Sequence, residues 1–207
     1  MATHIELLWI PLGADGSRLV RGGGRLYERL QALLQRRSPR DLYHAALRVH
    51  PEDGTAYVIE VGPAWGNPAL DRGVVRTGPV GARVLGRCVL FRYEVRCWRG
   101  GAIPDAHAAV PGPLDVPTDQ ARTALLLHRA HDVPVAVWGR RAPGTTEMWN
   151  SNSVVSWLLS GSGHDLPPVP TGGRAPGWCA GVQLAGPVAV VPDAAGPRTL
   201  SHESDPS

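Results

Sequence analysis

The chain has 207 residues, of which 43% are hydrophobic and 19% charged, with a formal net charge of +3. This balance excludes a disordered chain, and no apolar run approaches the roughly 20 residues needed to span a bilayer. The positive residues, all arginine, are spread along the chain without stacking aromatics, which argues against nucleic-acid binding. We expect one domain over residues 1–191 and a disordered polar tail over residues 192–207.

The first half of the chain predicts a strand, a helix and a β-hairpin, in that order. Ile5–Leu12 is an apolar, β-branched run that ends at a glycine-rich turn, as a strand does. Leucines at helical spacing predict a helix over Arg25–Arg37. Leu42–Val49 and Thr55–Val61 are strand-like runs on either side of the turn signal Pro51–Gly54, so we expect them to pair as a hairpin.

The second half predicts further strands and two helices. Strands are expected at Gly73–Arg76, Cys88–Cys97, Val133–Trp138 and Gly181–Val191. Thr118 is expected to cap a helix over Asp119–Arg129, and a last helix is expected over Ser151–Leu159, ending at a Ser/Gly-rich turn. The pattern as a whole predicts an α+β fold, with an antiparallel sheet packed against helices.

Three residues in these elements have side chains suited to acyl transfer. His44 lies in the first strand of the hairpin, Glu60 in the second, and Ser151 at the start of the last helix. A carboxylate can orient an imidazole, and the imidazole can take the proton of a hydroxyl nucleophile. Backbone N–H groups at a helix start can stabilise an oxyanion. The three residues together predict a Ser-His-Glu triad.

The motifs around these residues resemble the circularly permuted branch of the NlpC-type papain-like superfamily, which includes lecithin-retinol acyltransferase-like proteins. The strand Tyr43–Val49 matches the branch's aromatic-His-hydrophobic motif, and Glu60 occupies the position of its polar third member. Asn150–Val154 matches its Asn-Cys-Asn-Ser/Thr motif, with Ser151 replacing the cysteine. The resemblance implies a permuted papain-like fold and places the nucleophile at Ser151; residues 62–117 do not align with the branch.

Serine at this position leaves more than one function open. Serine needs a better-aligned base than cysteine, and each residue of Asn150–Ser153 is also a favoured helix N-cap. We expect an acyl-transfer hydrolase of an ester or amide bond, in which Ser151 attacks, His44 is the general base and Glu60 orients His44. The alternatives are a non-catalytic member of the fold that binds a peptide, glycan or acyl ligand, and a scaffold with an exposed partner surface. The candidate pocket residues are Asn150, Asn152, Trp149, Arg174 and Trp178.

The remaining polar residues suggest no cofactor. His128 and His131 have a spacing that can bind metal but lack a third ligand, so we expect no metal site. An odd number of cysteines and a start without a secretion signal predict free thiols and a cytoplasmic protein, and the arginine-rich, lysine-free composition suggests a bacterial origin. Cys88 and Cys97 are expected to be buried. The expected partner is a small-molecule, peptide or lipid substrate, and the oligomeric state is left open.

Overall fold

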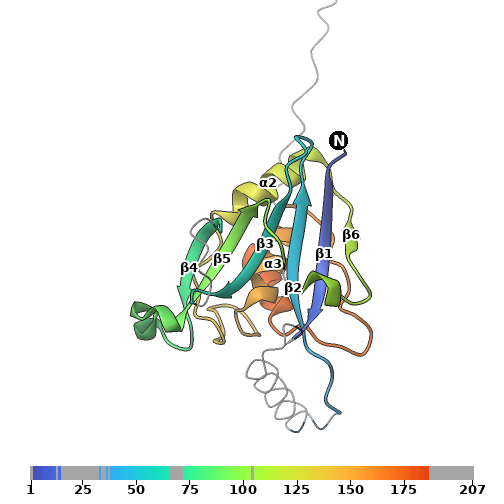
Figure 1. Cartoon of the computed structure of the whole chain (residues 1–207). Helices are drawn as coiled ribbons and strands as arrows, with labels where there is room; N and C mark the ends of the chain where they lie inside the picture. Colours follow the sequence, from blue (N-terminus) through green and yellow to red (C-terminus); the bar gives the residue numbers. More distant parts are fainter. Residues whose placement is uncertain are drawn as a thin grey trace, which may run out of the picture.

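The computed structural model describes residues 2–12, 14, 33, 36, 38–65, 72–103 and 105–186. Six strands form one open antiparallel sheet in the order β4-β5-β3-β2-β1-β6 (Figure 1). Their bounds are β1 His4–Pro11, β2 Tyr43–His50, β3 Tyr57–Pro63, β4 Val74–Pro79, β5 Arg92–Arg99 and β6 Leu114–Val116. The predicted α+β class with an antiparallel sheet is therefore confirmed.

Three α-helices pack on one face of this sheet, behind it in Figure 1. They are α2 Gln120–Ala130, α3 Ser151–Gly161 and α4 Trp178–Ala185, and the 3₁₀ helices are η1 Arg83–Arg87, η2 Val89–Phe91 and η3 Ala106–Ala108. Among the described residues, no helix has the length and apolar character required to cross a membrane.

Side-chain alternation along the strands separates two hydrophobic cores. In β2, Tyr43, Ala45, Leu47 and Val49 belong to the larger core, together with α3 residues such as Val155. We call the side of the sheet that packs on α3 the helix face. Ala46 instead belongs to a smaller core on the opposite side, which we call the far face. Its other buried members are Leu8, Ile10, Val58 and Ile103.

The predicted hairpin is formed by β2 and β3, which pair from Leu47–Ile59 to Val49–Tyr57. The turn between them is closed by a hydrogen bond from the Gly54 N–H to the Pro51 carbonyl, and Gly54 has a φ of 76° that favours glycine. The predicted first strand, the strand near Gly73 and the helices that follow Asp119 and Asn150 are also present.

The strand predictions Cys88–Cys97 and Val133–Trp138 are wrong in part and in full, respectively. Within Cys88–Cys97, only the residues from Arg92 onward are a strand, because η2 occupies Val89–Phe91. Val133–Trp138 is not a strand: only Trp138 forms isolated bridges, to Val80 and Trp149. Pro134 lacks the N–H that a continuous ladder requires in this segment.

The predicted final strand Gly181–Val191 is also wrong as far as the structure describes it. Residues up to Ala185 belong to α4, and the residues after Gly186 lie outside the described part of the chain. One carboxylate oxygen of Glu147 accepts hydrogen bonds from the N–H groups of Gly177 and Cys179 (2.8 and 3.2 Å). This cap comes from about 30 residues earlier in the sequence, where a local pattern cannot reveal it.

Other differences concern ends and short elements. The cap of α2 is Asp119, which accepts from the Arg122 N–H, and not Thr118. The short strand β6 was not predicted. The predicted helix Arg25–Arg37 lies almost wholly outside the described residues, and the predicted tail 192–207 lies entirely outside them.

Candidate functional site

The polar motif at the start of α3 forms a dense hydrogen-bonded junction. The side-chain oxygen of Asn150 accepts from the N–H groups of Asn152 and Ser153 (2.9 and 3.3 Å), and the Ser153 hydroxyl accepts from the Asn150 N–H (3.1 Å). This is a complete capping box. The N–H groups that were expected to stabilise an oxyanion are thus already bonded at Asn152 and Ser153.

Asn152 joins α3 to β2. Its side-chain oxygen accepts from the Ala45 N–H (2.8 Å), and its NH₂ group donates to the carbonyls of Tyr43 (3.0 Å) and Pro176 (2.9 Å). The ladder between β2 and β3 ends at Leu47, so this edge of β2 has separated from β3 at Ala45 and Tyr43. The amide of Asn152 therefore takes the place of a strand backbone at the opening between β2 and β3.

The loop before α4 completes the same junction. The Arg174 carbonyl accepts from the Tyr43 N–H (2.8 Å), and the Arg174 N–H donates to the Asp41 carbonyl (2.8 Å). The Ser153 hydroxyl lies 2.8 Å from the Gly177 carbonyl, and the Asn150 NH₂ group donates to Pro176 (2.8 Å). In this way the predicted pocket residues Asn150, Asn152 and Arg174 all join chain segments together.

The two tryptophans among the predicted pocket residues also pack against protein. Trp149 is fully buried in the main core, and its ring N–H donates to the Tyr93 hydroxyl (3.2 Å). Trp178 begins α4, and its ring lies 4.7 Å from that of Trp9 at an angle of 56°. Both contacts belong to the helix face, where core packing accounts for them.

Ser151 differs from its neighbours in the motif. It is the first residue of α3 and is 5% exposed, and within the described part of the chain its hydroxyl has no hydrogen-bond partner. It lies on the same helical stripe as Val154, Val155 and Leu158, which belong to the main core. The side chain of Ser151 is therefore associated with the helix face of the sheet.

Strand alternation places His44 and Glu60 on the other face. His44 lies between Tyr43 and Ala45, and Glu60 between Ile59 and Val61; these four neighbours all belong to the helix-face core. Successive side chains of a strand point to opposite faces, so both candidate residues project from the far face. The structure thus brings His44 and Glu60 to one face of the sheet and associates Ser151 with the other.

Glu60 belongs to a partly buried ionic cluster on the far face. Its carboxylate lies 3.9 Å from the Arg96 guanidinium, which in turn lies 3.3 Å from Glu94. Arg72 forms a bidentate pair with Glu94 (2.8 and 2.6 Å). Burial raises the pKa of Glu60 above its ordinary value, while Arg96 opposes the rise and Asp105 adds to it. The carboxylate of Glu60 is therefore engaged by an arginine.

A hydrogen-bonded Ser–His pair does occur, at Ser162 and His164 (2.8 Å). Both residues are buried, and the other ring nitrogen of His164 lies 2.8 Å from the Thr118 hydroxyl. Burial, together with the charge of Arg122, lowers the pKa of His164 below its ordinary value. The Ser162 hydroxyl is also bonded to the Leu158 carbonyl (2.6 Å), so this buried pair belongs to the hydrogen bonding that closes the end of α3.

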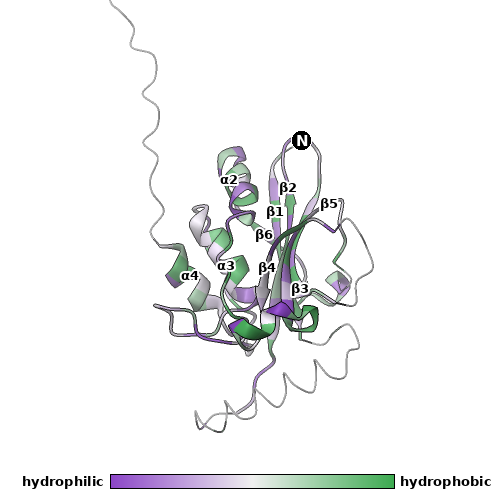
Figure 2. Ribbon diagram, turned by 90° about the vertical axis from the view of Figure 1, so that its left-hand side faces the viewer, coloured by the Kyte–Doolittle hydropathy of each residue, from purple (hydrophilic) through white to green (hydrophobic). Residues whose placement is uncertain are grey.

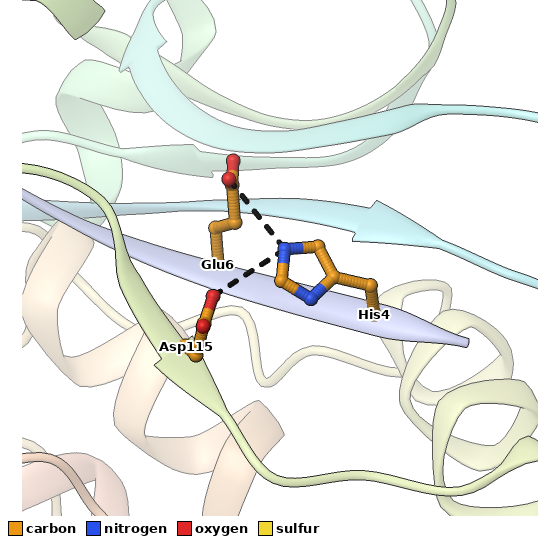
Figure 3. Close-up of side chains that lie close together, drawn as sticks. All are labelled: His4, Glu6 and Asp115. Atoms are coloured by element: carbon orange, nitrogen blue, oxygen red, sulfur yellow. Dashed lines mark ion pairs between the residues drawn. The ribbon is translucent and has the colours of Figure 1, made fainter. Parts of the chain in front are cut away.

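A second group of side chains that sequence analysis did not identify lies on β1 and β6. Figure 3 shows the His4 ring between the carboxylates of Glu6 and Asp115, at 3.5 Å from each. The three candidate ligand atoms lie within 4.8 Å of one another, a spacing compatible with a metal ion. However, the other Glu6 oxygen is paired with Arg48 (3.2 Å), and the Asp115 side chain is largely exposed. Ion pairing on the surface accounts for this group.

The structure also describes the three cysteines and the two histidines at metal-binding spacing, His128 and His131. All three cysteines have free thiols, as predicted, but Cys88 is exposed, contrary to the prediction. Cys97 is partly buried, and burial raises its pKa to about 11. The side chain of His128 is largely exposed and lies 3.8 Å from Asp132, and His131 is exposed as well.

The comparisons with known proteins assign no family. Neither a protein-family model, nor a curated protein, nor a solved structure matches this chain. The structure thus establishes an α+β fold whose six-stranded sheet packs against three helices, and any finer assignment is a proposal.

Proposed function

We propose that this chain is a non-catalytic binding protein on a permuted papain-like architecture, in which the former nucleophile motif has become a structural junction. The observation that carries the proposal is the alternation of β2, which directs His44 away from the face on which α3 packs. A general base must come within about 3 Å of its nucleophile, directly or through one water molecule.

The bonding of the motif supports the same proposal. Asn150, Asn152 and Ser153 are each bonded to a separate part of the chain, and Asn152 replaces strand pairing at β2. Glu60 lies 3.9 Å from the Arg96 guanidinium, so an arginine takes part in binding the carboxylate that was predicted to orient His44. The ligand classes in keeping with the resemblance are a peptide, a glycan or an acyl chain.

One observation favours the hydrolase as a second candidate. Ser151 lies at a helix start, and its hydroxyl has no hydrogen-bond partner within the described residues, although all its motif neighbours have one. A hydroxyl without a structural role is what a nucleophile position would retain. The two candidates therefore differ in a single measurable property, the reactivity of Ser151.

Fluorophosphonate labelling followed by intact-mass measurement tests the proposal. We expect no labelling of the wild-type protein and none of Ser151→Ala, and we expect ester hydrolysis at the rate of buffer for both. Ser151→Cys serves as a third variant, because a thiol at an intact site would gain acyl-transfer activity. Labelling of the wild type that disappears in Ser151→Ala would overturn the proposal and establish the hydrolase.

A further inference from the structure

The segment Arg83–Phe91, which forms η1 and η2, exposes apolar side chains to solvent. Val84 is 68% exposed and Leu90 60% exposed, and Leu85, Val89 and Phe91 are exposed as well. The segment projects from the end of the sheet beyond β4 and β5 in Figure 1, and Figure 2 shows hydrophobic residues on this side of the molecule. We call these nine residues the apolar protrusion.

Hydrogen bonds to the backbone hold the protrusion in place, and its apolar side chains are not needed for this. The Arg92 guanidinium donates to the carbonyls of Gly86 and Arg87, and the Val80 N–H donates to the Phe91 carbonyl (2.8 Å). Gly86 packs so closely on Pro79 that an added Cβ would lie 2.8 Å from the Pro79 side chain. An ordinary surface segment exposes polar side chains, whereas this segment exposes apolar ones. A clustered apolar patch of this kind marks a contact surface.

Exposed arginines lie in the protrusion and beside it. Arg83 and Arg87 are exposed within it, and Arg140 is exposed beside it, with its side chain donating to the Gly81 carbonyl (2.8 Å). The sequence from residue 73 to residue 93 contains no aspartate or glutamate. The complementary surface is therefore one that combines negative charge with an apolar interior.

We propose that the apolar protrusion docks this protein onto an anionic lipid surface, with its leucine, valine and phenylalanine side chains inserted among the acyl chains and its arginines bound to lipid phosphates. Segments that combine apolar side chains with arginines bind membranes in this way. A second copy of the chain fits less well, because self-docking would bring arginines together without an acidic residue between them. The inference is independent of whether Ser151 is a nucleophile.

Co-sedimentation of the full chain with vesicles tests the proposal. Vesicles of equal parts phosphatidylglycerol and phosphatidylcholine are compared with pure phosphatidylcholine vesicles, at low and high salt. We expect binding to the anionic vesicles that weakens strongly in high salt. Leu90→Asp is expected to weaken this binding by about tenfold or more, and Arg83→Gln with Arg87→Gln by roughly fivefold per arginine.

Matched controls separate docking from general surface effects. Leu125 is exposed on α2 and Arg99 at the other end of β5, so Leu125→Asp and Arg99→Gln should bind as the wild type does. Circular dichroism of each variant checks that the fold is retained. Three outcomes would overturn the proposal: absence of binding to the anionic vesicles, equal loss in Leu90→Asp and Leu125→Asp, or concentration-dependent self-association that Leu90→Asp abolishes in place of vesicle binding.

Discussion

Replacing Asn152 with alanine is expected to lower the free energy of unfolding by about 3 kcal/mol. The change removes three hydrogen bonds, to Ala45, Tyr43 and Pro176, and Asn152 is only 2% exposed. It leaves the Ala45 N–H and the Tyr43 carbonyl without their partner, and each unsatisfied buried group costs about 1–3 kcal/mol. We take a value near the lower end of the sum because water can enter a cavity of this polarity.

Ser151→Ala provides the matched control one residue away. Its hydroxyl has no partner among the described residues, and alanine is a better helix former, so we expect a change within about 0.5 kcal/mol. Both variants are measured by urea unfolding at 25 °C, followed by far-ultraviolet circular dichroism and tryptophan fluorescence. If Asn152→Ala unfolds at the same midpoint as Ser151→Ala, Asn152 does not replace strand pairing at β2 and the reasoning fails.

Three further predictions concern other parts of the fold. Folding lowers the pKa of His164 below 6.5, so the unfolded chain binds the proton more readily than the folded protein does. The free energy of unfolding should therefore fall as the pH drops from 6.5 toward the pKa of His164 in the folded protein. In urea unfolding at several pH values, His164→Gln should weaken this pH dependence, and an unchanged pH dependence would contradict the prediction. Gly177 has a φ of 88°, and a Cβ there would lie 2.6 to 2.7 Å from three oxygen atoms. Gly177→Ala should therefore lower the melting temperature by several degrees. An unchanged melting curve would argue against this close packing. Thiol titration at pH 8 should detect the exposed Cys88 and Cys179 first and Cys97 only slowly. A pKa of about 11 in place of 9.0 leaves Cys97 with about one hundredth of the thiolate. Three thiols that react equally fast would contradict the burial of Cys97.

The hairpin and the helix start at Ser151 could be predicted from sequence because their signals are local. Pro51–Gly54 is a turn by composition, and the cluster of N-cap residues before Val154 marks the beginning of a helix. Segments whose structure depends on distant partners were predicted less well. The start of α4 is capped by Glu147 from elsewhere in the chain, and an apolar run of this length is compatible with either a helix or a strand.

The face of the sheet from which each candidate residue projects was harder to predict, although the sequence contains part of this information. In Tyr43–His50 the apolar side chains alternate with His44, Arg48 and His50, so a helix packed on the apolar side leaves His44 on the opposite one. The role of Asn152 could not be predicted, because its partner at Ala45 is 107 residues away. Motif order and spacing alone therefore suggested a triad without fixing the faces of its members.

The distance along the chain between Asn152 and β2 also bears on how the protein is made. Ala45 leaves the ribosome 107 residues before Asn152 does, which at ordinary rates of synthesis is roughly 5–20 s. During that time the edge of β2 at Tyr43 and Ala45 has no partner from α3, and an unpaired strand edge can pair with another nascent chain. Chains that terminate before α3 would keep this edge open, so they are the forms of this protein in which aggregation should begin.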